Sequence, residues 1–362
     1  MRITLARIGV LAAAMTLMAA TAAFAHGAVD DTANPWLAWN VTWDVALGTL
    51  ITVGLYARGI WRLKHKTDSA RIWRHVSFFA GLAAIFLALQ SPIDAIAERS
   101  FLIHQVQHLL VRLAGPMLIF LSAPQGILVA GMPDKFQRHV VNPVISDRTV
   151  RRFFGFFAHP AVATAVFVGA LYVWQYPRFH NAALLDDNLH YLMHASMLFA
   201  GLLFFWRIFD PRPAPLGTGY GVRLMMLWIM VLSNIAIGSY LALKTEMLYA
   251  AYDLKGRLWH PPLTDEQLGA ATMWIPNGMM GLVAVLIVIH LWGRQETRDE
   301  MRRTAKLARY GHGWNEPPVT AATLYEMTAA KNRATGLGLA FFSVCVFAVA
   351  ILFGVINLIV EF

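Results

Sequence analysis

Long apolar runs recur along the whole sequence, and they constrain the fold more than any other feature. The candidate membrane spans lie at about 44–61, 76–92, 101–122, 160–176, 189–207, 222–243, 273–293 and 337–359. A helix needs about 20 predominantly apolar residues to cross the hydrocarbon of a bilayer. Charged residues make up only 14% of the chain, whereas a soluble domain carries about 25%. The sequence therefore predicts an all-α integral membrane protein, a polytopic bundle of about seven to eight transmembrane helices.

The first residues have the pattern of a secretory signal peptide. Arg2 and Arg7 give a basic start, an apolar core follows, and "AFA" at 23–25 is a small-x-small cleavage site. An uncleaved first span is the alternative, and either case leaves the next residues outside the membrane. The expected parts are a signal peptide at 1–25, a seven-helix membrane domain at 26–293, a basic cytoplasmic segment at 294–335 and a C-terminal transmembrane helix at 336–362.

Lysine and arginine alternate in density from one connection to the next. The connections rich in these residues are 62–75, 123–158, 207–223 and 294–335. Together they hold 21 of them, against five in the segments between the same spans. Because positive loops favour the cytoplasmic side, this pattern places both termini at the periplasmic face of a bacterial inner membrane. The net charge of +9 is thus an orientation signal, and nucleic-acid binding is not expected.

Two pairs of histidines share a four-residue spacing: His104 with His108, and His190 with His194. Residues at i and i+4 lie on the same face of an α-helix, about 6 Å apart. Each pair falls in the first turns of a span that runs inward, so we expect both pairs near the outer surface. Capping of carbonyls or a place among the headgroups is the alternative interpretation. Ionisable groups inside spans usually mark a functional interior, and neutral imidazole is a common metal ligand.

Two further candidate ligands lie at the start of the seventh apolar run. Asp265 is expected just before the helix and Met273 inside it. Their ordinary interpretations are an acidic residue favoured by the helix dipole and an apolar filler. Imidazoles with thioethers suit copper, and the single cysteine, Cys345, cannot form a thiolate framework. The predicted copper site, shallow and incompletely enclosed so that the metal can leave, comprises His104, His108, His190, His194, Asp265 and Met273.

Arg112 is the residue that fits this site least. It lies one turn below His108, deep in the third apolar run. A cation at that depth needs a carboxylate, helix-end carbonyls or water beside it, and it repels a metal ion placed nearby. The metal is therefore expected nearer the surface than Arg112.

Four stretches of the sequence resemble motifs of a known family. They are "HQVQHLLVRLAGPMLIFLSAP" at 104–124, "VWQYPRFHNAAL" at 173–184, "HYLMHASMLFAGLLFFW" at 190–206 and "DEQLGAATMWIPNG" at 265–278. In order, spacing and topology they are similar to the multi-spanning CtaG family of cytochrome c oxidase assembly factors, over about residues 40–293. Family members often have an aliphatic residue and a second proline where this chain has Arg112 and Gly115.

The resemblance implies a role in maturing a haem–copper oxidase by helping copper reach its catalytic subunit. Its histidine positions fall on His104, His108, His190 and His194, and its acidic entry to the seventh span falls on Asp265. The expected partners are the oxidase catalytic subunit, a periplasmic copper chaperone and membrane lipid. No enzymatic activity is expected, because the sequence has no HExxH, GxSxG or nucleotide-binding loop.

Three other functions use similar residues. A membrane di-iron enzyme also uses the HxxxH spacing, but it needs adjacent histidines on the cytoplasmic side, and this sequence has no His-His dipeptide. A b-type cytochrome needs histidines from different helices across a haem, which the two pairs could supply. A copper permease needs polar groups through the whole membrane, for which His290, Asn234 and Asn277 are candidates. The permease and the b-type cytochrome stay open as alternatives to an assembly factor.

Overall fold

A computed structural model describes residues 35–39, 41–63, 72–212 and 216–309, together with single residues and short stretches between 326 and 348. The expected signal peptide at 1–25 lies outside the described residues, as does most of the expected C-terminal transmembrane helix. The chain divides after Val288 into two compact units. The fold described below is that of the first unit, and the end of its last helix is treated by itself.

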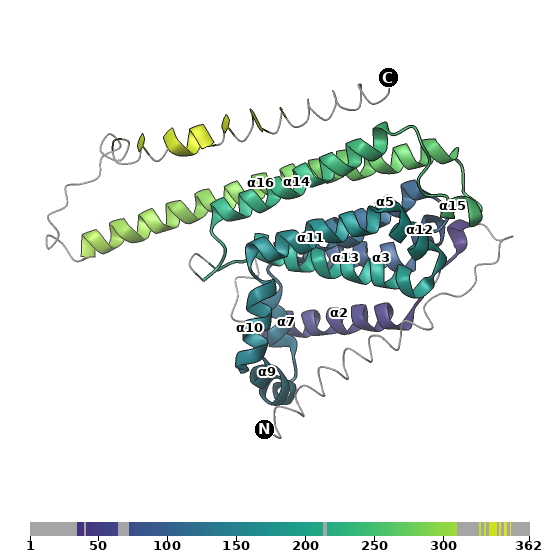
Figure 1. The fold of residues 1–362 in the computed structure, drawn as a ribbon. Helices are drawn as coiled ribbons and strands as arrows, with labels where there is room; N and C mark the ends of the chain where they lie inside the picture. The colour runs from purple at the N-terminus through teal and green to yellow at the C-terminus, as the bar shows by residue number, and fades with distance from the viewer. Residues whose placement is uncertain are drawn as a thin grey trace. The chain divides into compact units, whose positions relative to one another are not determined.

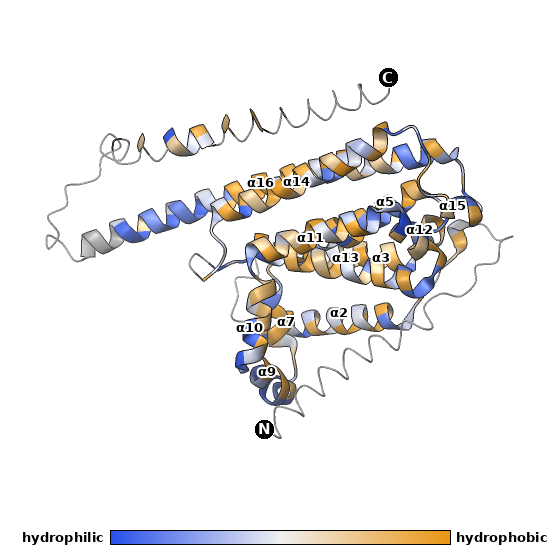
Figure 2. Ribbon diagram, viewed as in Figure 1, coloured by the Kyte–Doolittle hydropathy of each residue, from blue (hydrophilic) through white to orange (hydrophobic). Residues whose placement is uncertain are grey.

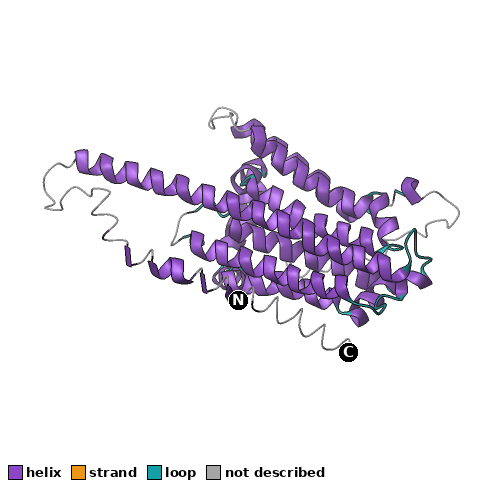
Figure 3. Ribbon diagram, turned by 90° about the horizontal axis from the view of Figure 1, so that it is seen from above, coloured by secondary structure: helices purple, strands orange, loops and turns teal. Residues whose placement is uncertain are grey.

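The seven apolar runs between residues 44 and 293 are all helical, and the ranges described contain no strand. Figure 1 shows these helices, and Figure 3 shows short loops joining them. The long helices are α2 (Trp43–Leu63), α3 (Ile72–Gln90), α11 (Pro160–Gln175), α13 (Asp187–Ile208), α14 (Tyr220–Leu243) and α16 (Pro262–Arg309). The third run is a composite of α5 (Phe101–His108), the π-helical turn η3 (Leu109–Ala114) and α6 (Gly115–Leu121).

Shorter helices connect the long ones. They are η2 (Pro35–Leu37), α4 (Pro92–Ala97), α7 (Gln125–Gly131), α8 (Asp134–Phe136), η4 (Gln137–Val141), α9 (Asn142–Ser146), α10 (Arg148–Phe157), α12 (Pro177–Leu185) and α15 (Ala251–Leu254). Two of them continue a longer helix at a sharp bend, α7 at 78° to the composite helix and α10 at 61° to α11.

Four helices are long and apolar enough to cross a membrane: α3, α13, α14 and the part of α16 from Pro262 to Thr304. The two bent pairs raise this number to six if each counts as one span. Asp44 and Arg58 lower the mean hydropathy of α2, which is not among these candidates. The fold is therefore an all-helical membrane protein with four to six candidate spans, and the expected seven to eight spans stay a prediction. Figure 2 shows the apolar residues along α3, α11 and α13.

α16 is longer than the seventh apolar run at both ends. It begins at Pro262, so Asp265 lies in its first turn instead of before the helix. At the other end the helix continues to Arg309, so the first part of the basic segment expected at 294–335 is helical. Figure 2 shows that this last part of α16 is mostly hydrophilic.

Close helix packing depends on glycines. A Cβ atom added to Gly201 of α13 would lie 2.1 Å from the carbonyl oxygen of Arg112 in η3. The residue four positions after Arg112, whose N–H would bond this carbonyl in an α-helix, is Pro116, and proline has no N–H. In the same way, Gly59 of α2 approaches the backbone of Ile127 in α7, and Gly131 of α7 approaches the backbone of Leu55 in α2. Small residues at such contacts let helices in membranes approach closely, and here they bring α13 against the helix that carries His104.

Candidate metal centre

The start of α5 is fixed by a carboxylate from a distant helix. Asp265 of α16 accepts hydrogen bonds from the hydroxyl of Ser100 at 2.9 Å and from the backbone N–H groups of Phe101 at 2.8 Å and Leu102 at 3.2 Å. The first N–H groups of a helix have no partner within the helix, and a negative charge beside them is favourable. This contact sets the position of His104, which lies one turn further along α5.

α13 begins in a more local way. The side chain of Asp186 caps the helix by accepting from the N–H of Leu189 at 2.9 Å. His190 and His194 follow in the first two turns of α13 and are both buried. The ring centroids of His190 and His194 are 4.5 Å apart, so the pair shares one face of the helix, as its spacing predicts.

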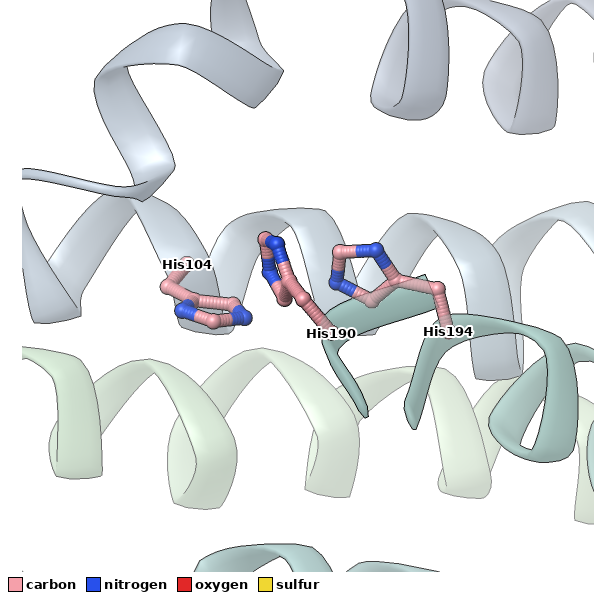
Figure 4. Close-up of side chains that lie close together, drawn as sticks. All are labelled: His104, His190 and His194. Atoms are coloured by element: carbon pink, nitrogen blue, oxygen red, sulfur yellow. The ribbon is translucent and has the colours of Figure 1, made fainter. Parts of the chain in front are cut away.

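The two helices bring three imidazoles together. His104, His190 and His194 each offer one ligand atom, and these atoms all lie within 4.8 Å of one another. The ring centroid of His104 is 5.3 Å from that of His190 and 5.6 Å from that of His194. Figure 4 shows the three rings next to one another, with His190 and His194 on one helix and His104 on another. We call these three residues the histidine triad.

His108 lies beside the triad without being one of its three residues. Its ring centroid is 4.4 Å from that of His104 and 5.4 Å from that of His194. Both of its ring nitrogens are buried and have no hydrogen-bond partner among the described residues. His108 can therefore supply a further nitrogen to a group held by the triad after a small side-chain rotation.

The histidines are enclosed, which differs from the shallow, incompletely enclosed cluster expected from the sequence. The exposed fraction is 0% for His104 and only 7% for His194, the most exposed of the four expected histidines. The cause is the pair of short helices α12 and α15, whose side chains pack against His104. This cover could not be predicted from the sequence, because both helices lie in polar connections between apolar runs.

Sequence reasoning missed His180 of α12. Its ring centroid is 5.1 Å from that of His104, and its nitrogens lie 2.9 Å from the carbonyl oxygen of Trp174 and 2.8 Å from the hydroxyl of Tyr252. Burial lowers the pKa of His180 to about 4, so the ring is neutral near pH 7. The available signal was its position in the stretch "VWQYPRFHNAAL", which resembles a family motif.

Tyr252 of α15 was also missed. Its hydroxyl lies 2.6 Å from Nδ1 of His104, and its side chain is fully buried. Burial, and after it the negative charge of Asp265, raises the pKa of Tyr252 well above its usual value, so the phenol keeps its proton. A tyrosine in a connection between spans carries no sequence signal for this role.

Asp265 and Met273 lie apart from the triad in their contacts. Besides its bonds to the start of α5, Asp265 forms a buried ion pair with Arg257 at 2.8 Å. Met273 belongs to an apolar cluster that includes Met193, Met197 and Phe101. Neither residue is in the group of three that can hold a metal ion among the described residues.

Arg112 is buried and lies against an aromatic ring. Its guanidinium carbon is 3.7 Å from the ring centroid of Phe167, and its Nη2 donates to the carbonyl oxygen of Phe167 at 3.1 Å. The sequence led us to expect a carboxylate, helix-end carbonyls or water beside this cation. The partners are instead a carbonyl oxygen in the middle of α11 and the π face of the same residue, Phe167. The guanidinium group of Arg112 is therefore bound by Phe167 of α11 and not by the histidines of the triad.

The donor set suits a borderline or soft transition-metal cation. Three imidazoles converge without a carboxylate among them, and imidazole is a ligand for copper, zinc, iron and nickel. Nε2 of His104 is buried and has no hydrogen-bond partner in the part of the chain that the structure describes. A buried polar atom without a partner is costly, and a bound cation would remove that cost. The residues present thus fit a metal ion.

Fold and site together define a class: an all-helical membrane protein with a buried cluster of histidines able to hold a metal ion. The family model described as cytochrome c oxidase caa3 assembly factor (Caa3_CtaG) matches residues 54–295, and the chain belongs to this family. The resemblance seen in the sequence is thereby confirmed.

Two mycobacterial proteins are among the curated relatives. The uncharacterized protein Mb0105 of Mycobacterium bovis and the uncharacterized protein MT0111 of Mycobacterium tuberculosis are each 23% identical to the chain over 265 residues. The alignment covers 71% of this chain and only 39% of each relative, so both relatives are much longer proteins. No solved structure matches the chain.

Proposed function

We propose that this protein holds copper at the histidine triad and helps to deliver it to the catalytic subunit of a haem–copper oxidase. The family supplies the link to cytochrome c oxidase assembly. The observation that carries the metal part is the convergence of His104 with His190 and His194, from two helices, into one buried group. His108 serves as an additional ligand during binding or release.

Copper is the proposed cargo for two reasons. Its binding by imidazole is strong, since copper stands at the top of the affinity order for divalent ions, and imidazole also suits the cuprous ion when thiolates are absent. Haem–copper oxidases also contain copper, which an assembly factor for them has a reason to handle. Asp265 and Met273 are left out of the first ligand set, because Asp265 contacts the start of α5 and Met273 packs in the apolar cluster.

The proposed role is ligand exchange without catalysis. An assembly factor binds and passes on a metal ion, and the triad contains no nucleophile beside the imidazoles. The proposed setting is a bacterial inner membrane with the triad toward the periplasm, an orientation that the alternation of lysine and arginine between connections supports. A periplasmic copper chaperone is the proposed donor, and the oxidase catalytic subunit is the proposed acceptor.

Deletion of the gene tests the proposal in the cell. We expect oxidase activity and the copper content of the catalytic subunit to fall, and added copper to restore part of both. Complementation with a His104→Ala, His190→Ala double variant should leave the defect in place. His139→Ala is the matched control, because His139 is exposed and bonds only locally to the carbonyl of Lys135. Normal copper loading in the deletion strain would refute the delivery role.

Purified protein distinguishes the alternatives. Copper that co-purifies in a stoichiometric amount and disappears in the double variant supports a holding site. A Soret band in the purified protein would instead favour a b-type cytochrome. Transport of copper into sealed vesicles by the protein alone would favour a permease.

A further inference from the structure

Tyr252 joins two buried histidines through one hydroxyl group. Its oxygen lies 2.6 Å from Nδ1 of His104 and 2.8 Å from Nε2 of His180. The other nitrogen of His180, Nδ1, lies 2.9 Å from the carbonyl oxygen of Trp174, near the end of α11. A continuous row of hydrogen bonds therefore runs from a backbone carbonyl to the triad.

The carbonyl decides which atoms of His180 carry protons. A backbone carbonyl can only accept a hydrogen bond, so Nδ1 of His180 must donate to Trp174. A neutral imidazole carries one N–H, so Nε2 of His180 then has a lone pair and accepts. Its neighbour at 2.8 Å is the hydroxyl of Tyr252, which is therefore the donor in that bond.

The same reasoning reaches the triad. The single proton of the Tyr252 hydroxyl is directed at His180, so toward His104 the phenol oxygen can only accept. Nδ1 of His104 must then be the N–H that donates across the 2.6 Å contact. Nε2 of His104 is left with the lone pair, and it is the nitrogen that has no hydrogen-bond partner among the described residues.

We infer that the Trp174 carbonyl, His180 and Tyr252 form a hydrogen-bonded relay that fixes the tautomer of His104 and aims its Nε2 lone pair at the metal. This inference rests on the proposed function, since it assigns outer partners to the proposed ligand. His180 and Tyr252 are positioning residues and not ligands, because all of their polar side-chain atoms are used within the relay. Outer partners of this kind orient a ligating histidine and raise its basicity.

The opposite proton order is disfavoured by charge. If Tyr252 donated to His104, Nε2 of His180 would have to donate to Tyr252 while its Nδ1 still donated to Trp174. His180 would then be an imidazolium ion, buried at 0% exposure. An unpaired buried cation is costly, so the order with a neutral His180 is favoured.

The first test observes the tautomer directly and needs no metal. Full-length protein with ¹⁵N-labelled histidine is reconstituted in lipid, and the His104 signals are assigned by difference from a His104→Gln variant. We expect the metal-free wild type to show protonated Nδ1 and unprotonated Nε2 at His104. A wild-type His104 protonated at Nε2 would overturn the relay, whatever the variants do.

The second test measures affinity for copper(I) ions against a competing chelator. Tyr252→Phe removes only the hydroxyl, and we expect it to lower the affinity by about 10- to 100-fold, with a mixture of His104 tautomers. His180→Leu should act in the same way. His180→Gln, whose side-chain amide can both donate and accept, should recover part of the affinity.

Tyr249→Phe is the matched control. Tyr249 is also fully buried in the same connection, and its hydroxyl donates to the carbonyl of Gln175 at 2.8 Å instead of to a histidine. We expect this variant to keep wild-type copper affinity and the wild-type tautomer of His104. Equal losses in Tyr249→Phe and Tyr252→Phe would show a general packing effect and overturn the relay.

The two tests separate this inference from the proposed function. A wild type that binds no copper refutes the proposed function, while the tautomer measurement still confirms or refutes the relay. A wild type that binds copper, with Tyr252→Phe unchanged in affinity and tautomer, refutes the relay and leaves the metal site standing. If Tyr252→Phe does not fold, the wild-type tautomer and the His180 variants decide the outcome.

Discussion

The bundle buries two polar centres that lie close along the same composite helix, and they are built in opposite ways. At the histidine triad, three imidazoles converge from α5 and α13. One turn beyond His108, Arg112 carries a permanent positive charge that faces the π surface and the carbonyl oxygen of Phe167. The first centre offers three imidazoles to a cation, and the second contains a guanidinium cation of its own together with electron-rich neighbours.

This difference shows what burial alone cannot tell. Both centres are almost fully enclosed, and each would look equally unusual in an apolar run. Arg112 has partners that a guanidinium ion accepts, and its one buried unpaired atom, Nε, carries a donor N–H that cannot bind a metal ion. Nε2 of His104 and both nitrogens of His108 have no hydrogen-bond partner within the described ranges. A candidate metal centre is therefore recognised by buried ring nitrogens that have no hydrogen-bond partner, and not by the mere presence of a buried polar residue.

The largest effect is expected from removing one member of the triad. His194→Ala should lower copper affinity by roughly 100-fold or more, because losing a ligand costs more than losing an outer partner. The wild type should also gain about 4 kcal/mol of stability at a free copper concentration 1,000 times Kd, and His194→Ala should lose about 2.7 kcal/mol or more of that gain. Thermal unfolding with and without copper measures this, with His139→Ala as the control. An unchanged copper-dependent shift in His194→Ala would make the triad an ordinary packed cluster, no different in kind from Arg112.

Asp265 offers a third buried charge with which to sharpen the comparison. It bonds Ser100, two backbone N–H groups and Arg257. Breaking a buried ion pair by removing one partner typically costs about 3–5 kcal/mol, so Asp265→Ala should strongly lower the unfolding temperature. If Asp265 anchors α5 without binding metal, the molecules that remain folded should keep copper affinity within about threefold, a factor worth less than 1 kcal/mol. A large loss of affinity in folded Asp265→Asn protein, which preserves the shape of the side chain, would instead assign it to the ligand set.

Much of the helical framework could be predicted from the sequence, because each apolar run is long enough to be recognised as a candidate membrane-spanning helix. The seven runs from 44–61 to 273–293 each lie in a helix or in the composite helix, to within about two residues at their ends. Each HxxxH pair also predicts a shared helical face, and the ring distances within the pairs agree with it. These features depend only on local periodicity.

The rest of the site depends on contacts between distant residues. Which faces of α5 and α13 meet is set by packing, such as the approach of Gly201 to the Arg112 carbonyl. His180 and Tyr252 are 72 residues apart, and neither lies in an apolar run. Asp265 reaches Ser100 across 165 residues, so the acidic residue that seemed to belong to the site could not be assigned to the start of α5. Spacing within a helix carries no information about such partners.

Gly201 allows α13 to pack closely against η3, next to both polar centres. A methyl group at this position should push the two helices apart. Its Cβ would lie 2.1 Å from a backbone oxygen, which cannot move away as a side chain can. Gly201→Ala should therefore destabilise the protein by about 1–3 kcal/mol. Gly169→Ala on α11 is the matched control, because nothing lies within 4 Å of its added Cβ; it should be neutral or stabilising by up to about 1 kcal/mol. Unfolding in detergent compares the two variants, and equal stabilities would show that α13 can shift relative to η3 at little cost.

The smallest expected effect tests whether the two centres interact electrostatically. For unit charges about 8 Å apart at an effective dielectric constant of about 20, repulsion is about 2 kcal/mol. Removing the charge with Arg112→Met, which keeps an adaptable side chain against Phe167, should raise copper affinity by roughly 3- to 30-fold. Arg223→Met is the control: Arg223 is equally buried, and it bonds the carbonyl of Ile208, about 20 Å along α13 from His194. That variant should leave copper affinity unchanged. A lower affinity in Arg112→Met would mean that Arg112 supports the triad through packing more than it opposes the metal through charge, and the two centres would then be one functional unit.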